Sequence, residues 1–393
     1  MSKRPKENNS LNDFIPIFRN SIPSELHEVF EVLWEHDKDV YIVGGAVRDC
    51  LLGFPVTDFD IITNAYPEEG LKFLSAKGIK VKPIGGEFGT ILAILGKNTT
   101  FDISTFRQEI FSFFGPPEIV FVNTLEEDLP RRDFTINAIV YDPRTQKFVD
   151  KFNGFHDLQE GKIKTIGDAL TRFTEDGTRI IRLARFISQF DLEVHSEVLA
   201  ALQSIGKNAR FFSYSTLQKE FFKLLSLQDP RRGLSLLWTT EILTSLVPNF
   251  PISKVEDVEA EKILFYYRKI PSRDVWIRFF GLLLFLSEEK SQTEENWLSI
   301  SLDLQISSKE QKKLMHIFHS WLKFPSFPET KKLKRWIRAT GINTSEDLSQ
   351  LIFLKAELEE RSDILIKKEK YLKGVQIILD SFRRRSSDNN SLS

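Results

Sequence analysis

The residues best suited to chemistry are two aspartates that follow a pair of glycines. Asp58 and Asp60 flank Phe59 in a segment of strand character, and side chains at i and i+2 of a strand share one face. Both carboxylates would then point into one volume. Gly44 and Gly45 precede a predicted helix, where free N–H groups attract anions. Two carboxylates beside a phosphate cradle predict a divalent metal held against a triphosphate.

The elements that must position these residues can be read around them. Residues 40–43 form a short apolar run of strand type, and residues 46–52 have the pattern of a helix that Gly53 ends. Arg48 lies one turn inside that helix. Each motif alone has a simpler interpretation, because Gly-Gly before a helix is usually a tight turn and Asp-x-Asp is usually a solvated loop. Their order and close spacing make the pair more specific.

Further along the chain, other polar residues have both a structural and a functional interpretation. Residues 90–95 and 100–104, separated by Gly-Lys-Asn, predict a hairpin whose second strand carries Asp102. An edge-strand aspartate facing water is one reading of Asp102, and a site carboxylate is the other. Arg132 and Asp133 could form a surface ion network. Asp176 and Arg179, predicted to share a face of a long helix running to residue 190, could form an i, i+3 salt bridge.

The motifs together resemble those of the class II tRNA nucleotidyltransferase and bacterial poly(A) polymerase family. Its first motif is Gly-Gly-x-Val-Arg-Asp, then Leu-Leu-Gly, then Asp-x-Asp. Ten positions of this chain match it: Gly44, Gly45, Val47, Arg48, Asp49, Leu51, Leu52, Gly53, Asp58 and Asp60. Residues 131–138, RRDFTINA, are similar to a second motif, and Glu175, Asp176 and Arg179 to a third.

The resemblance implies a role for each candidate residue. Asp102 would complete a cluster with Asp58 and Asp60 that holds two Mg²⁺ ions. Asp176 and Arg179 would select cytosine, and with a small rearrangement adenine, because a carboxylate and a guanidinium read base edges by geometry. The remaining nucleotide-binding residues implied by the family are Gly44, Gly45, Arg48, Arg132, Asp133, Asn137, Arg182 and Arg185. The implied activity is template-independent transfer of CMP, and of AMP, from CTP and ATP to the 3′ end of tRNA.

Two departures from the family keep alternatives open. Between Arg107 and Val120 the family has a loop with arginines, whereas residues 108–119 here read QEIFSFFGPPEI. This difference raises the alternative of an enzyme that adds only the two cytosines. Thr216 stands where an arginine usually precedes Glu220 by four residues, which weakens the expected bracing of the base-selecting helix. A poly(A) polymerase shares the same motifs, and a catalytically silent RNA-binding protein is an alternative of another class.

Composition and charge complete the expected organisation. With 393 residues, 41% hydrophobic, the chain suffices for several packed units. Net charge is −1, yet residues 305–385 carry 18 Lys or Arg against 10 Asp or Glu, as expected if RNA binds there. Neither a secretory signal nor a membrane span is expected, which favours a cytoplasmic protein. One cysteine excludes an internal disulfide.

The predicted fold class is α+β, with a mixed-sheet head of the nucleotidyltransferase (polymerase-beta-like) type followed by an all-helical neck, body and tail. The expected divisions are a disordered N-terminus over residues 1–22, the catalytic head over 23–165, the neck with the base-selecting motif over 166–245, the body over 246–325, and a basic tail for tRNA over 326–393 that becomes disordered from Arg383. From about residue 190 onward no strand is expected. KKLKRWIR, residues 331–338, surrounds Trp336 with basic side chains and is a candidate tRNA contact.

Overall fold

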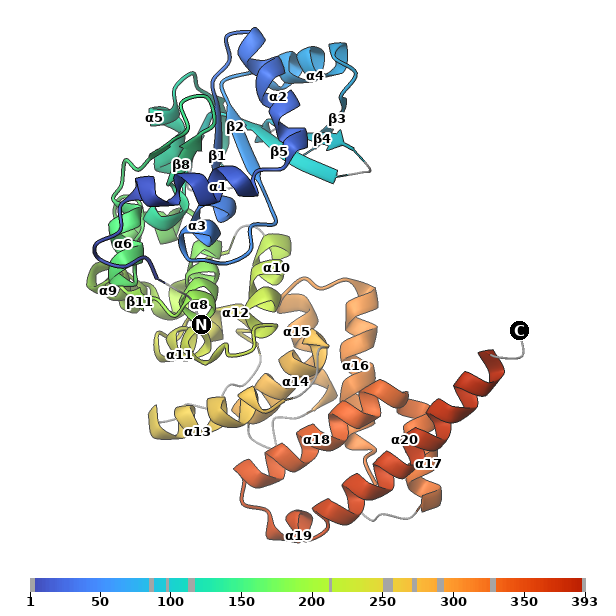
Figure 1. The fold of residues 1–393 in the computed structure, drawn as a ribbon. Helices are drawn as coiled ribbons and strands as arrows, with labels where there is room; N and C mark the ends of the chain where they lie inside the picture. The colour runs from blue at the N-terminus through green and yellow to red at the C-terminus, as the bar shows by residue number, and fades with distance from the viewer. Residues whose placement is uncertain are drawn as a thin grey trace. The chain divides into compact units, whose positions relative to one another are not determined.

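The computed structural model of the chain describes residues 4–84, 88–96, 99–111, 117–211, 214–249, 257–270, 274–287, 293–325 and 330–390. The chain divides into two compact units (Figure 1). The first contains residues 1–179 and 190–204, and the second contains residues 180–189 and 205–393.

A mixed seven-stranded sheet forms the centre of the first unit, in the order β3-β4-β5-β2-β1-β8-β9. Its strands are β1 (Val40–Val43), β2 (Asp60–Thr63), β3 (Lys80–Ile84), β4 (Thr90–Leu95), β5 (Thr99–Thr105), β8 (Val140–Asp142) and β9 (Lys147–Val149). β2 and β5 are parallel, and all other neighbours are antiparallel. The predicted mixed-sheet head is therefore confirmed, as is the hairpin of β4 and β5, whose turn residues 97–98 lie outside the described residues.

Each face of this sheet is covered by different elements. Helices α2 (Ser24–Glu35) and α4 (Pro67–Ala76) pack against one another and lie along one face (Figure 1). Leu26, Val29, Phe30 and Leu33 supply the apolar stripe of α2 and are buried, as their helical spacing predicts. On the other face a core cluster forms around Val43, Ile62, Phe106, Val122, Leu125, Leu129 and Val140.

The remaining elements of the first unit are short. They are η1 (Leu11–Phe14), α1 (Ile15–Ser21), α3 (Gly45–Leu51), β6 (Arg107–Ile110), β7 (Glu118–Phe121), α5 (Leu125–Asp128), η3 (Leu129–Arg131), η4 (Thr135–Asn137), α6 (Gly154–Glu160), β10 (Lys162–Ile163), α7 (Ala169–Glu175), the start of α8 (Thr178–Phe190), β11 (Glu193–Val194) and α9 (Ser196–Ile205). β6 and β7 form a separate antiparallel ribbon. β11 pairs in parallel with β10, which corrects the expectation of no strand beyond residue 190.

The N-terminal segment is ordered where disorder was expected. Residues 11–21 form η1 and α1, and Phe18 is fully buried against the rings of Phe59, Tyr141 and Phe148. The polar composition of the first 12 residues predicted disorder for the whole segment. A single buried aromatic ring, here Phe18, can nevertheless dock a short segment onto the domain.

The second unit is helical in all its described residues apart from connections. It contains most of α8, then η5 (Gly206–Asn208), α10 (Tyr214–Leu225), α11 (Arg231–Thr239), α12 (Ile242–Leu246), α13 (Asp257–Arg268), α14 (Val275–Leu286), α15 (Glu294–Asp303), α16 (Ser308–Leu322), α17 (Thr330–Thr340), α18 (Ile342–Leu358), α19 (Ser362–Leu365) and α20 (Lys368–Asn390). α18 and α20 lie side by side (Figure 1).

One expectation for the C-terminal part needs correction, and the expected tRNA contact of the basic residues 331–338 stays a prediction. α20 continues to Asn390, so the tail predicted to be disordered from Arg383 is helical up to that residue. Trp336 is 5% exposed and its indole Nε1 donates to the carbonyl oxygen of Ser320 at 2.7 Å. Its ring therefore lies in the buried face of α17, against α16, while the basic side chains around it, such as Lys331 and Arg335, are exposed.

Across the described ranges, no helix is both long enough and apolar enough to cross a bilayer.

Candidate active site

The predicted carboxylates lie at one end of the sheet because of strand register. Val43, the last residue of β1, pairs with Asp60, the first residue of β2, and Asp60 pairs with Asp102 of β5. Directly paired residues of neighbouring strands project to the same face. Gly44 follows Val43, and a Cβ built on it would lie 3.3 Å from Oδ2 of Asp60. Its φ of +76° favours glycine.

Asp58 is placed differently from the prediction. It precedes β2, which begins at Asp60, and its side chain is exposed. The i and i+2 argument therefore does not apply within a strand. Asp58 is nevertheless close enough for its charge to act on Asp102. Burial raises the pKa of Asp102 above its ordinary value, and the charge of Asp58 raises it further.

The three carboxylates supply the hard oxygen donors that divalent cations take. In the described part of the chain, no group of three or more His, Cys, Asp or Glu side chains stands arranged to hold a metal ion. Donor type and register thus fit a cation at Asp60 and Asp102, whereas the three-ligand cluster stays a prediction.

A buried polar network joins the glycine motif to the RRDFTINA motif. Arg48 on α3 donates from Nη1 to Oδ1 of Asn137 at 2.7 Å, and Asn137 donates from Nδ2 to Oδ1 of Asp133 at 2.9 Å. Exposure of the three residues is 7%, 5% and 9%. Arg48 also donates to Asp49 at 2.7 Å and lies 4.6 Å from the ring centre of Phe190. These contacts are internal, so the predicted phosphate contact of Arg48 stays a prediction.

Arg132 is the one predicted phosphate ligand with an unsatisfied buried donor. Its Nη2 lies 3.2 Å from Oδ2 of Asp128, whereas its Nε is buried and has no hydrogen-bond partner among the described residues. Burial lowers the pKa of Arg132, and Asp128 and Asp60 oppose that shift. For Asp128, burial would raise the pKa, but Arg132 and Arg131 hold it below its ordinary value. A buried unpaired donor of this kind is costly unless a ligand satisfies it.

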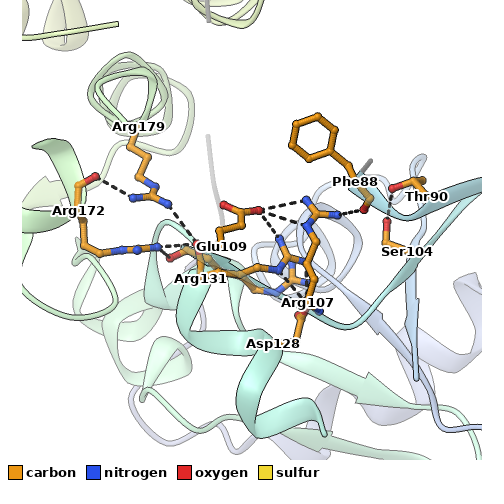
Figure 2. Close-up of polar contacts among 10 residues, drawn as sticks. Phe88, Thr90, Ser104, Arg107, Glu109, Asp128, Arg131, Arg172 and Arg179 are labelled. Atoms are coloured by element: carbon orange, nitrogen blue, oxygen red, sulfur yellow. Dashed lines mark hydrogen bonds and ion pairs between the residues drawn. The ribbon is translucent and has the colours of Figure 1, made fainter. Parts of the chain in front are cut away.

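Arg131 is the centre of a second ionic network, which the motif reading did not assign (Figure 2). Its Nε donates to Oδ1 of Asp128 at 2.9 Å, and its Nη1 lies 3.4 Å from Oε1 of Glu109. Its carbonyl oxygen accepts from Arg172 at 2.5 Å and from Arg179 at 3.3 Å. Side chain and backbone of one residue thus connect the β6–β7 ribbon with α7 and α8.

The base-selecting motif folds differently from the predicted single helix. α7 ends at Glu175, and Asp176 has extended backbone and accepts from the N–H of Thr178 at 2.9 Å, before α8 begins. Arg179 is 4% exposed and its Nη1 forms an ion pair with Oε2 of Glu175 at 3.0 Å, instead of the expected pair with Asp176. Sequence reasoning missed Glu175 as the partner, although its i, i+4 spacing from Arg179 was available as a signal.

Arg182 and Arg185 belong to the second unit. On α10, buried Glu220 receives Arg185 Nε at 2.7 Å, with Arg182 Nη1 at 3.7 Å and Lys223 Nζ at 3.0 Å. Burial would raise the pKa of Glu220, but Arg185 and Arg182 hold it below its ordinary value. α8 and α10 are thus ion-paired even though Thr216 replaces the expected arginine.

Comparison with known proteins agrees with the motifs. A model of the poly A polymerase head domain matches residues 40–164. The CCA-adding enzyme of Lactococcus lactis subsp. lactis (strain IL1403) is 41% identical over 213 residues, which cover 53% of this chain and 52% of the relative. The CCA-adding enzyme of Ligilactobacillus salivarius (strain UCC118) is 37% identical over 227 residues, covering 56% and 55%. The chain therefore spans about half the length of these curated relatives.

Solved structures show the same fold over most of the chain. The crystal structure of the Bacillus stearothermophilus CCA-adding enzyme in complex with CTP aligns with a TM-score of 0.68 at 23% identity, and covers 92% of this chain and 83% of that one. Residues 40–164 are therefore similar in sequence to the poly A polymerase head domain, and the solved structure shows the same fold over most of the chain.

Proposed function

We propose that this protein is a template-independent tRNA nucleotidyltransferase that adds CMP and AMP, from CTP and ATP, to the 3′ end of tRNA. The observation that carries the proposal is the register of Val43 with Asp60 and of Asp60 with Asp102, which brings two carboxylates beside the turn at Gly44. The CCA-adding relatives support the choice of tRNA as the acceptor.

In this mechanism the chain orients the reactants and offers charge where charge develops. Arg132, whose buried Nε has no partner among the described residues, would donate to a phosphate oxygen of the nucleotide. Asp133, fixed by Asn137 and by the N–H of Phe134 at 2.8 Å, would accept from the ribose hydroxyl. Asp176 and Arg179 would read the base edge once Arg179 exchanges some of its present contacts for the base.

The family generally uses divalent metal ions, and we propose Mg²⁺ held by Asp58, Asp60 and Asp102. When bound, such ions lower the pKa of the attacking 3′-hydroxyl and neutralise the departing pyrophosphate. The donor set supports the assignment, since all three ligands offer carboxylate oxygen.

Localisation to the cytoplasm stays a prediction.

A second candidate, addition of the two cytosines only, is favoured by the absence of arginine from residues 108–119. Residues 112–116 of this loop lie outside the described residues. At its described start, the ring of Phe111 lies 5.4 Å from the guanidinium of Arg179, so an aromatic contact stands beside the base-selecting arginine.

One experiment distinguishes these outcomes. The protein is incubated with tRNA lacking its 3′ end, or with oligo(A), and with labelled CTP or ATP singly and together. CTP and ATP incorporation on tRNA indicates CCA addition, CTP alone indicates CC addition, and extension of oligo(A) indicates a poly(A) polymerase. The variants D58A and D60A should lose transfer but keep nucleotide binding, and turnover retained by either would reject the assignment.

A further inference from the structure

A groove on the second unit carries two lysines, Lys219 and Lys223, that the proposed active site does not use. It is lined by Arg185 and Gln189 of α8, by Lys219, Phe222 and Lys223 of α10, and by Ser226 and Leu227, which follow α10, and it has a volume of about 680 Å³. The helical positions follow helical spacing, i, i+4 on α8 and i, i+3, i+4 on α10, so each helix presents one face to the groove.

The groove has an excess of positive charge. Glu220 lies beside it and is 4% exposed, and it is shared by Arg182, Arg185 and Lys223. Lys219 is a further cation of the lining, and it is exposed and forms no ion pair with a described residue. None of the described residues lining the groove is acidic.

An aromatic ring lies between these cations. Phe222 is half-buried, held from behind by Trp276 at 4.8 Å and Phe279 at 5.9 Å between ring centres. A fixed, partly exposed ring in the same groove as two lysines matches the way proteins hold single-stranded nucleic acid, with phosphates on the cations and a base on the ring. The volume lies in the range of about 300–1,000 Å³ typical of small-ligand sites, which suits one or two nucleotides.

We propose that this groove binds the unpaired nucleotides at the 3′ end of the tRNA acceptor strand, with Lys219 and Lys223 on the phosphates and Phe222 against a base. The inference rests on the proposed function, which supplies an RNA ending in unpaired nucleotides. It adds a defined RNA-binding surface outside the nucleotide site.

The test compares the full-length double variant K219Q/K223Q with the parent. Both lysines are exposed, and Glu220 keeps Arg182 and Arg185, so the fold should be retained. The matched control is K72Q/K77Q, which removes two exposed lysines of the α4 region of the first unit. Binding of tRNA that ends in its unpaired nucleotides is measured by filter retention at 50 and 200 mM salt. Losing two single-strand phosphate contacts lowers the salt slope by about 1.4, so the affinity deficit of the variant should shrink about sevenfold between these salts.

Two further arms decide the identity of the ligand. A transcript trimmed to a blunt acceptor stem should bind parent and variant alike; an equal deficit on the blunt stem would overturn the assignment to unpaired nucleotides. An unchanged affinity and salt slope of K219Q/K223Q, or the same loss in K72Q/K77Q, would overturn the groove itself. Because binding is read without catalysis, failure of nucleotide transfer in the parent would reject the proposed function separately.

Discussion

The buried hydrogen-bond network from Arg48 through Asn137 to Asp133 allows a quantitative prediction for the variant N137A. The substitution removes two hydrogen bonds, of 2.7 and 2.9 Å, each with a charged partner. Hydrogen bonds to charged groups contribute about 1.5–3 kcal/mol each. Arg48 keeps its bonds to Asp49, and Asp133 keeps the N–H of Phe134, so the lower end applies. We expect the local free energy of opening to fall by about 3 kcal/mol.

Hydrogen–deuterium exchange with mass spectrometry is the suitable assay, because a chain of two units need not unfold in one step. Peptides covering α3 and η4 should exchange faster in N137A, whereas peptides of α18 should not change. The control is N64A, which removes one exposed hydrogen bond, from the N–H of Asp39 at 2.8 Å, and should cost less than about 1.5 kcal/mol. If N137A and N64A shift exchange by the same amount, the network does not stabilise the head as argued.

Three further predictions follow from single contacts. E220Q should lower stability by about 3–5 kcal/mol at pH 7, because it leaves two arginines of α8 without their carboxylate. Since the folded pKa of Glu220 is lowered from 4.5, its contribution is complete above pH 4.5, and the difference between parent and E220Q in a urea titration should disappear as the pH falls through the lowered folded pKa. G154A should destabilise the head, because a Cβ there would lie 2.2 Å from the carbonyl oxygen of Thr135; a melting temperature equal to that of the parent would contradict this. W336F should lower the melting temperature through the lost bond to Ser320 while tRNA affinity stays unchanged, and a tRNA defect in a fully stable W336F would show that the ring contacts RNA instead.

Sequence patterns located β1, β2, β4 and β5 and the positions of Asp60 and Asp102 on them, because apolar alternation and glycine turns are local signals. Asp60 and Asp102 were chosen from motif and alternation, and the parallel pairing of their strands brings them together. The partner of Arg179 was missed because the motif pointed to Asp176, although the i, i+4 spacing of Glu175 was also visible in the sequence. Motif spacing placed Asp176 beside it, but the backbone leaves the helix at Asp176, and Glu175 takes the contact instead.

The sequence also did not predict the burial of side chains that pack against segments far away in the chain. Phe18 packs against the rings of Phe59 and Phe148, which are 41 and 130 positions later in the chain. The indole of Trp336 is buried against α16. The residues ahead of the first anchor, 1–12, are polar and those around Trp336 are basic, so local composition predicts disorder in the first case and an exposed basic surface in the second. Only tertiary packing distinguishes such anchors from exposed side chains.

The parallel pairing of β2 with β5 has a consequence for synthesis on the ribosome. Antiparallel β1 and β2 can associate as soon as Thr63 has emerged, but β2 finds its parallel neighbour only after the chain through Thr105 is available. Pairings between distant segments form slowly because loop closure comes first. A nascent chain therefore exposes its glycine turn, Asp58 and Asp60 before Asp102 exists, so a fragment truncated ahead of β5 would lack the third proposed carboxylate however well its own strands fold.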